Sequence, residues 1–212
     1  VPCDVLIIES TFGLPIYKWP EPETVLCQIN DWWATNADQE RTSVVMTYAV
    51  GKAQRLLAGL DPNIGPIGIH GALVGPTEVY RAAGIELPET IRAGRDTATE
   101  LQDRGIIVCP PSAAGTPWIR RFSGKDGLET AFASGWMAIR GRQRWRGVDR
   151  GFILSDHADW DGLLNIVRNS NAKRVGVTHG STEAFARYLR EVEGLESFVL
   201  GDQRATSDGD DG

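Results

Sequence analysis

The stretch Val5-Leu-Ile-Ile-Glu-Ser-Thr-Phe-Gly13 decides how this sequence is interpreted. Its four consecutive aliphatic residues, followed by polar and turn-forming residues, predict a strand buried on both faces, as in a parallel sheet. The run ends at Glu9, so an acidic side chain is expected at the carboxyl end of this strand. Open α/β proteins build their sites at that edge of a sheet.

Strands and helices are expected to alternate along the rest of the chain. Further strands are predicted at 43–48, 67–70, 106–109, 130–137, 151–154, 174–178 and 197–200, and helices at 21–34, 52–60, 77–83, 161–168 and 182–193. Residues 84–105 are predicted to form a loop with a short helix, and another short helix is expected near Trp118. Alternation at this spacing indicates βαβ units, and therefore an α/β fold with a parallel sheet.

The composition is that of a globular protein, with 212 residues of which 42% are hydrophobic. A net charge of −6 argues against coating nucleic acid by bulk attraction, so any phosphate contact must be local. Cys3, Cys27 and Cys109 show no CxxC spacing, which argues against a disulfide framework or a thiolate zinc site and favours a cytoplasmic location. No apolar run of about 18 residues and no signal pattern is present, so no membrane span is expected.

Polar residues follow three of the predicted strands. Glu9 ends the first, His157 follows 151–154, and His179 follows 174–178. A histidine in such a place is often only structural, but three polar strand ends at one edge together indicate a site. Because Gly180 and Ser181 follow His179, we expect free backbone amides there, which suits a metal and phosphate site. His70 is the third histidine of the chain, and its spacing alone leaves it a competing candidate.

Three motifs occur in an order that resembles a known group of nucleases. They are IESTFG (8–13), SDHADW (155–160) and VTHGS (177–181). They resemble the signature motifs of the β-CASP group of metallo-β-lactamase-fold nucleases, which includes mRNA 3′-end processing factors. The longer segments GKAQRLLAGLDPNIGPIGIHG (51–71) and DRGFILSDHADW (149–160) are most similar to bacterial ligase-associated DNA exonucleases.

This resemblance implies a domain organisation and a function. Residues 1–13 and 135–200 would form the C-terminal half of a metallo-β-lactamase αββα domain, 14–134 an inserted β-CASP domain, and 201–212 a disordered acidic tail. The implied activity is zinc-dependent phosphodiester hydrolysis, expected to be that of a DNA exonuclease in repair. The implied partner is single-stranded DNA, with a DNA ligase and a helicase by family context.

The resemblance also implies roles for individual residues. His179 would be a zinc ligand, His157 would lie beside the scissile phosphate, and Glu9 would hold the other ring nitrogen of His157. A carboxylate beside an imidazole favours its protonated form, which can contact a phosphoryl oxygen or protonate a leaving oxygen. Asp156 and Asp159 flank the histidine as supporting candidates, although capping of the following helix explains Asp159 equally well.

The chain departs from the family at its chief metal-binding motif. The HxHxDH sequence is absent, and three histidines cannot supply it. Two zinc ions are expected only in the intact protein, with the missing N-terminal half providing the other ligands, and the chain alone is expected to be inactive. Two alternatives stay open, an RNA-processing nuclease of the same fold and a non-catalytic module that binds nucleic acid or scaffolds a partner.

A row of arginines is a further candidate for contact with nucleic acid. Its members are Arg140, Arg142, Arg144 and Arg146, which alternate at the period of a strand. They predict either a track for the phosphate backbone or an ordinary solvated strand face. Lys52 and Gln54 could also touch phosphate, but surface exposure is the expected state of both.

Overall fold

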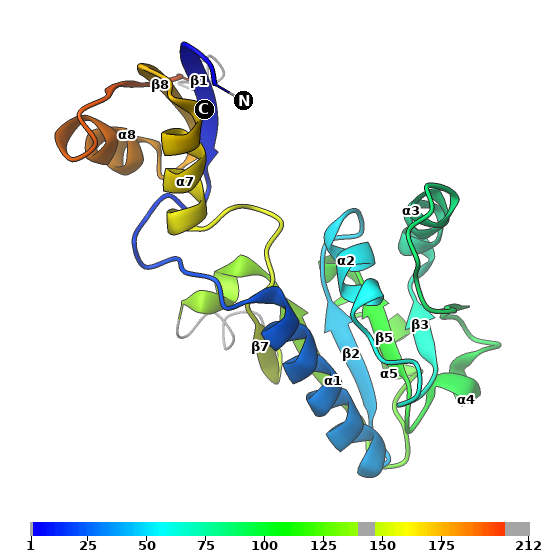
Figure 1. The fold of residues 1–212 in the computed structure, drawn as a ribbon. Coiled ribbons are helices and arrows are strands. Elements are labelled where there is room, and N and C mark those ends of the chain that lie inside the picture. Colours follow the sequence, from blue (N-terminus) through cyan, green and yellow to red (C-terminus); the bar gives the residue numbers. More distant parts are fainter. Residues whose placement is uncertain (1, 140–146, 202–212) are drawn as a thin grey trace, which may run out of the picture. The chain divides into compact units, whose positions relative to one another are not determined.

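The computed structural model describes residues 2–139 and 147–201, which belong to two compact units (Figure 1). The smaller unit comprises Val1–Lys18 and His157–Gly212, and the larger unit comprises Trp19–Asp156. The sequence placed the divisions after residues 13 and 134, whereas the compact units divide after residues 18 and 156. The second division lies later because 150–152 pairs with the sheet of the larger unit.

The larger unit is built on a six-stranded sheet whose pairings are all parallel. Its strands are β2 (Thr42–Met46), β3 (Ile67–Ile69), β4 (Ile91–Arg92), β5 (Ile106–Cys109), β6 (Leu128–Ala133) and β7 (Arg150–Phe152). They lie in the order β4-β3-β5-β2-β6-β7. This confirms the predicted α/β class with parallel strands.

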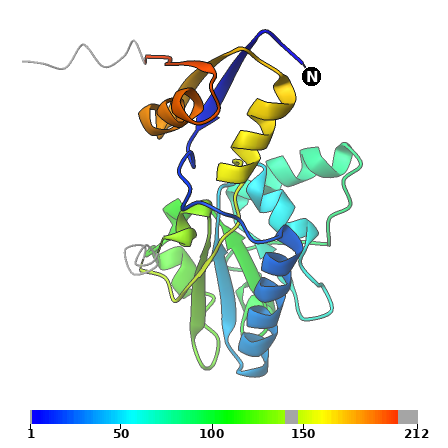
Figure 2. The same ribbon diagram turned by 60° about the vertical axis from the view of Figure 1, so that its left-hand side comes forward.

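Helices cover both faces of this sheet. The larger unit contains α1 (Pro22–Asp38), α2 (Lys52–Ala58), α3 (Gly71–Ala82), α4 (Ala98–Leu101) and α5 (Pro117–Arg120). Helices α1, α2 and α3 bury their apolar residues with Val45 and Val108 on one face. Helices α4 and α5 pack with Val44 and Ile107 on the other, because neighbouring strand residues point to opposite faces. Both views show α1 running alongside β2 (Figures 1 and 2).

The smaller unit holds a three-stranded parallel sheet in the order β1-β8-β9. Its elements are β1 (Val5–Ser10), α7 (Trp160–Ser170), β8 (Arg174–Gly180), α8 (Thr182–Glu191) and β9 (Glu196–Val199). Both helices pack against the sheet face that carries Ile8 and Val177, with Trp160 and Phe185 in edge-to-face contact at 5.6 Å. The core of this unit therefore lies on one side of its sheet.

The prediction that β1 is buried on both faces is wrong. Val5 is 44% exposed and Ile7 is 64% exposed, because their face of the sheet is not covered by the described residues. The start predicted for α3 is also wrong, since the helix begins at Gly71 and not at Thr77. The earlier start follows from the His70 side chain, whose Nδ1 accepts a hydrogen bond from the first turn of the helix.

The strand predicted at 130–137 is shorter and is followed by a different structure. Strand β6 ends at Ala133, and the next turn is the 3₁₀ helix η2 (Gly135–Ala138), which is capped by Ser134. Across the ranges given above, none of the helices combines the length and apolar character needed to cross a membrane. The arginine row at 140–146 and the acidic tail after residue 201 lie outside the described residues.

Candidate functional site

The site is built where β1 and β8 of the smaller unit end side by side. Glu9 pairs with Thr178, but the next partner of β1, Ser10, pairs with Gly180, so the register shifts by one residue. The extra residue in β8 is His179, which has a left-handed backbone with φ of 53°. Such a bulge redirects a side chain at the end of a strand. Glu9 and His179 are thereby placed on neighbouring strands at the same edge.

Ser10 fixes the turn that carries His179. The Ser10 hydroxyl donates to the His179 carbonyl oxygen at 2.6 Å, and the Ser10 carbonyl accepts from the Ser181 amide at 2.9 Å. The expectation of a free amide at Ser181 is therefore wrong. Gly180 has φ of +81°, and a Cβ on it would lie 2.6 Å from the Ser10 carbonyl carbon, so only glycine fits.

The His179 side chain is exposed at this turn. Its Nδ1 lies 2.9 Å from the hydroxyl of Thr178, which holds the ring in one orientation. A metal-ligating histidine commonly makes such a contact through the ring nitrogen that does not bind the metal. The arrangement therefore suits ligation through Nε2.

The second histidine meets the acid of β1 directly. Nδ1 of His157 lies 3.3 Å from Oε1 of Glu9, and the other carboxylate oxygen, Oε2, accepts a hydrogen bond from the Thr11 amide at 2.6 Å. The side chains of His157 and Glu9 are 51% and 31% exposed, so the pair is open to solvent. The contact through Nδ1 directs Nε2 to the far side of the ring, away from the acid.

A loop, and not a strand end, places His157 at the site. The sequence predicts that the strand before it lies in the same sheet as β1 and β8, but β7 belongs to the six-stranded sheet. The position of His157 is fixed instead by the start of α7. Asp159 caps that helix by accepting from the Gly162 amide at 2.8 Å, and the Trp160 amide donates to the Tyr17 carbonyl at 3.1 Å. Helix capping therefore accounts for Asp159.

Asp156 belongs to a cluster of charged residues in the larger unit. It lies 3.9 Å from Nη1 of Arg55, and that guanidinium also donates to the Ser155 carbonyl at 2.8 Å. Lys52 lies nearby and is only 3% exposed, with its Nζ 4.8 Å from the centroid of the Tyr48 ring. Burial lowers the pKa of Lys52, and the negative charge of Asp156 opposes that shift.

The prediction that Lys52 and Gln54 are exposed is wrong, since both are buried. The Gln54 side chain accepts from the Gly51 amide at 2.8 Å and donates to Thr77 at 3.2 Å. These bonds hold the turn at the start of α2 and assign Gln54 a structural role. The sequence does not predict the burial of Lys52, because a lysine in a polar turn ordinarily reaches solvent.

A complete metal site is not present in the described part of the chain. Within residues 2–139 and 147–201, no group of three histidine, cysteine, aspartate or glutamate side chains is arranged to hold a metal ion. Zinc requires at least three protein ligands, and His179 could supply only one of them. His70 lies in the larger unit at the end of β3, where its side chain caps α3.

The fold and site define an α/β protein with parallel sheets and an acid–imidazole pair at a strand end. No protein-family model matches the chain. A curated protein of Opitutus terrae named "Probable DNA ligase" is 34% identical over 200 residues, which cover 94% of this chain. The chain spans only 19% of the length of that protein.

Proposed function

We propose that this chain is part of a zinc-dependent nuclease with the β-CASP metallo-β-lactamase fold, and that the intact protein hydrolyses phosphodiester bonds in DNA. The observation that carries the proposal is the Glu9–His157 contact of 3.3 Å at the edge of the sheet that also bears His179. A protein that only binds nucleic acid does not require an acid that orients an imidazole. The resemblance of the three surrounding motifs supports the same function.

In this proposal the acid and the imidazole act as a unit. The Thr11 amide holds the Glu9 carboxylate, and the carboxylate holds Nδ1 of His157. A proton on the opposite nitrogen can then contact a phosphoryl oxygen or pass to the leaving oxygen as the P–O bond breaks. Glu9 is thus a positioning residue, and His157 is the catalytic residue.

His179 would be one zinc ligand of the intact protein. Bound zinc would supply a hydroxide nucleophile at neutral pH. The described residues do not fit a complete zinc site by themselves, so further ligands must come from elsewhere in the protein. The uncovered face of β1, with Val5 and Ile7 exposed on an edge strand, offers a surface on which another segment could pack.

The relative favours DNA as the substrate. Its printed name refers to DNA ligase, and this chain resembles only about a fifth of it. We therefore propose that the matched region is a nuclease segment that works beside a ligase, preparing ends that the ligase joins. RNA is the alternative substrate because RNA-cleaving proteins carry the same three motifs.

The test is a cleavage assay on the protein encoded by the complete reading frame that contains this chain. We expect labelled single-stranded DNA to be degraded in the presence of zinc, and His157→Ala to lower kcat about 10²- to 10⁴-fold, the usual contribution of a general acid. Glu9→Gln should lower kcat about 10- to 100-fold while zinc content stays unchanged. Glu191→Gln is the matched control, since Glu191 lies on the exposed side of α8 and, among the residues that the structure describes, pairs with Arg187 alone.

Zinc content separates the roles of the two histidines. His179→Ala should reduce bound zinc, measured by mass spectrometry of the metal, whereas His157→Ala should not. Full cleavage by the Glu9→Gln and His157→Ala proteins would refute the assignment. An intact protein that binds single-stranded DNA but cleaves neither DNA nor RNA would favour the scaffold function instead.

A further inference from the structure

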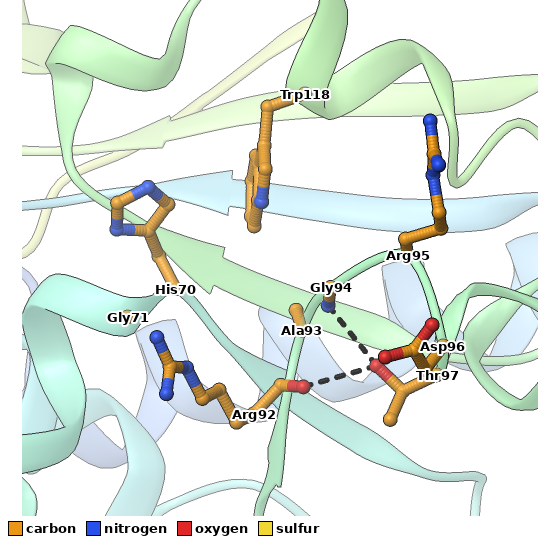
Figure 3. A pocket seen from close by; sticks show the side chains of 9 residues that line it. All are labelled: His70, Gly71, Arg92, Ala93, Gly94, Arg95, Asp96, Thr97 and Trp118. Atoms are coloured by element: carbon orange, nitrogen blue, oxygen red, sulfur yellow. Dashed lines mark hydrogen bonds between the residues drawn. The ribbon is translucent and has the colours of Figure 1, made fainter.

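The larger unit has a pocket of about 500 Å³ at the carboxyl ends of β3 and β4 (Figure 3). Nine residues line it: His70, Gly71, Arg92, Ala93, Gly94, Arg95, Asp96, Thr97 and Trp118. All nine belong to the larger unit, whereas Glu9 and His157 belong to the smaller one. The volume lies within the range of roughly 300–1,000 Å³ that is usual for small-molecule sites.

The topology of the sheet places this pocket where ligands commonly bind. Strands β3 and β5 are neighbours, but the chain leaves them towards opposite faces. After β3 it enters α3, which packs through Leu73 on the face of α1 and α2. After β5 it passes through a 3₁₀ turn (Pro111–Ala113) into α5, which packs through Ile119 on the opposite face. Such a switch point leaves a crevice beyond the carboxyl ends of the strands.

Two cationic side chains line this crevice, Arg92 at the end of β4 and Arg95 in the loop that follows it. Neither Arg92 nor Arg95 forms an ion pair with any residue in the described part of the chain. The guanidinium of Arg92 lies over the first residue of α3, where a Cβ on Gly71 would be 3.7 Å from its Nη2. The N-terminus of the 12-residue helix α3 carries partial positive charge, which adds to the positive potential of Arg92. With Asp96 as the one carboxylate, the lining carries a charge of 2 − 1 = +1.

The loop is held in shape by its own hydrogen bonds. The Thr97 hydroxyl donates to the Arg92 carbonyl at 3.0 Å and accepts from the Gly94 amide at 3.0 Å, as Figure 3 shows. The backbone from which Arg92 and Arg95 project is therefore fixed. A preformed arrangement binds an anion with less loss of conformational entropy.

An aromatic wall completes the pocket. Trp118 is half-buried, with its ring 4.6 Å from that of His70 and 4.9 Å from that of Phe122, both edge to face. In Figure 3 the indole stands between His70 and Arg95. Edge-to-face neighbours fix the plane of the indole, and such a plane can stack against a nucleobase.

We propose that this pocket binds a nucleoside monophosphate unit, with its phosphate at Arg92 beside the start of α3 and its base against Trp118. Arg95 adds positive charge on the other side of the indole (Figure 3). Guanidinium groups bind phosphate oxygens in a bidentate manner, and an aromatic face binds any base without regard to sequence. The unit can be a free mononucleotide or one nucleotide of a single strand. The proposal does not rest on nuclease activity, because the pocket needs neither zinc nor the Glu9–His157 pair.

Calorimetric titration of the 212-residue chain in EDTA tests this directly. The probes are thymidine 5′-monophosphate, thymidine, inorganic phosphate and a ten-nucleotide thymidine strand. We expect Arg92→Ala to weaken binding of the monophosphate about 10-fold or more, the effect of losing a charge-assisted hydrogen bond. Arg95→Ala should weaken it less, because that change removes only a more distant positive charge. Arg121→Ala, which removes another exposed positive charge from the same unit outside the pocket, should leave binding unchanged.

The Trp118 variants test the stacking part of the proposal. Trp118→Leu should weaken monophosphate binding about 5- to 100-fold, the range that base stacking supplies, and Trp118→Phe should retain most of the affinity. Melting curves would verify that both variants are folded. A loss in Arg121→Ala equal to that in Arg92→Ala, or inorganic phosphate binding as tightly as the monophosphate, would overturn the proposal.

The same titrations identify the source of the nucleotide. Strand binding at least 10-fold tighter than monophosphate binding, with the same sensitivity to Arg92→Ala, would support a subsite for a single strand. Equal affinities would support a site for free mononucleotides. Retained nucleotide binding in a protein that shows no cleavage would leave this proposal standing while the proposed nuclease function fails.

Discussion

Replacement of Gly180 by alanine should separate the two strands that carry the candidate site. A Cβ at this position would lie 2.6 Å from the Ser10 carbonyl carbon, a separation that real Cβ atoms essentially never show. The obstructing atoms belong to the backbone of Ser10 and Thr11, so rotation of a side chain cannot relieve the clash. Gly180→Ala should therefore push β1 away from β8 and disturb the Glu9 and His179 positions together.

The loss of stability expected for Gly180→Ala has two parts, a backbone cost and a steric cost. A left-handed backbone with φ of +81° costs an alanine about 1–2 kcal/mol. Overpacking against fixed atoms adds about 1–3 kcal/mol, so the total loss of stability should be about 2–5 kcal/mol. Gly194→Ala is the matched control, because Gly194 belongs to the same unit and has φ of +69° but no atom within 4 Å of an added Cβ. Gly194→Ala should lose only the stability that corresponds to the backbone cost, about 1–2 kcal/mol.

Amide hydrogen exchange of β1 and β8 in the 212-residue chain measures this difference. Exchange reports the free energy of local opening, so it resolves the smaller unit even if the two units unfold separately. We expect the β1 and β8 amides to lose more protection in Gly180→Ala than in Gly194→Ala. Losses that agree within about 0.5 kcal/mol would refute the close approach of Gly180 to Ser10, since that contact supplies at least about 1 kcal/mol.

Three further predictions follow from single side chains. Burial raises the pKa of Cys109 to about 12, so a thiol reagent at pH 8 should modify only the exposed Cys3 and Cys27 quickly, and three fast thiols in mass spectrometry would contradict this. Asp159→Ala should lower the free energy of unfolding by about 0.5–2 kcal/mol through loss of the cap of α7, and Asp159→Ser should recover most of it in urea titrations. Burial lowers the pKa of His70, so the unfolded chain takes up a proton first as the pH falls. The stability that this histidine contributes should be fully present above about pH 6.5 and decline below it, and His70→Asn, which keeps the cap, should make urea midpoints less dependent on pH.

Strands could be predicted where burial requires a run of consecutive apolar residues in the sequence. The aliphatic run at 106–109 forms β5 with the predicted bounds, because a strand covered on both faces needs consecutive apolar residues. Strand β4 was missed within the segment predicted as a loop. It consists of Ile91 and Arg92 alone, and two residues at the edge of a sheet are too few to show a period.

The motifs indicated which residues form the candidate site, but they did not predict how these residues are arranged in space. The sequence indicated Glu9 and His179 at strand ends, and both lie at the ends of neighbouring strands. It could not show that β7 pairs with β6 and that His157 therefore reaches Glu9 on a loop, because strand pairing depends on contacts between distant segments. The buried Lys52 was missed for the same reason, since no local pattern marks it.

The pairing of β1 with β8 has a consequence for the order of folding. Ser10 and His179, which share a hydrogen bond, are separated by 169 positions in the sequence. Joining them in a disordered chain requires closure of a very long loop, and proteins dominated by such contacts fold slowly. Once the larger unit has formed, with Trp32 of α1 packed against Phe152 of β7 at 5.6 Å, most of that loop is already ordered. We therefore expect the six-stranded sheet to form first during refolding, and the Glu9–His157 pair to assemble in the last kinetic phase.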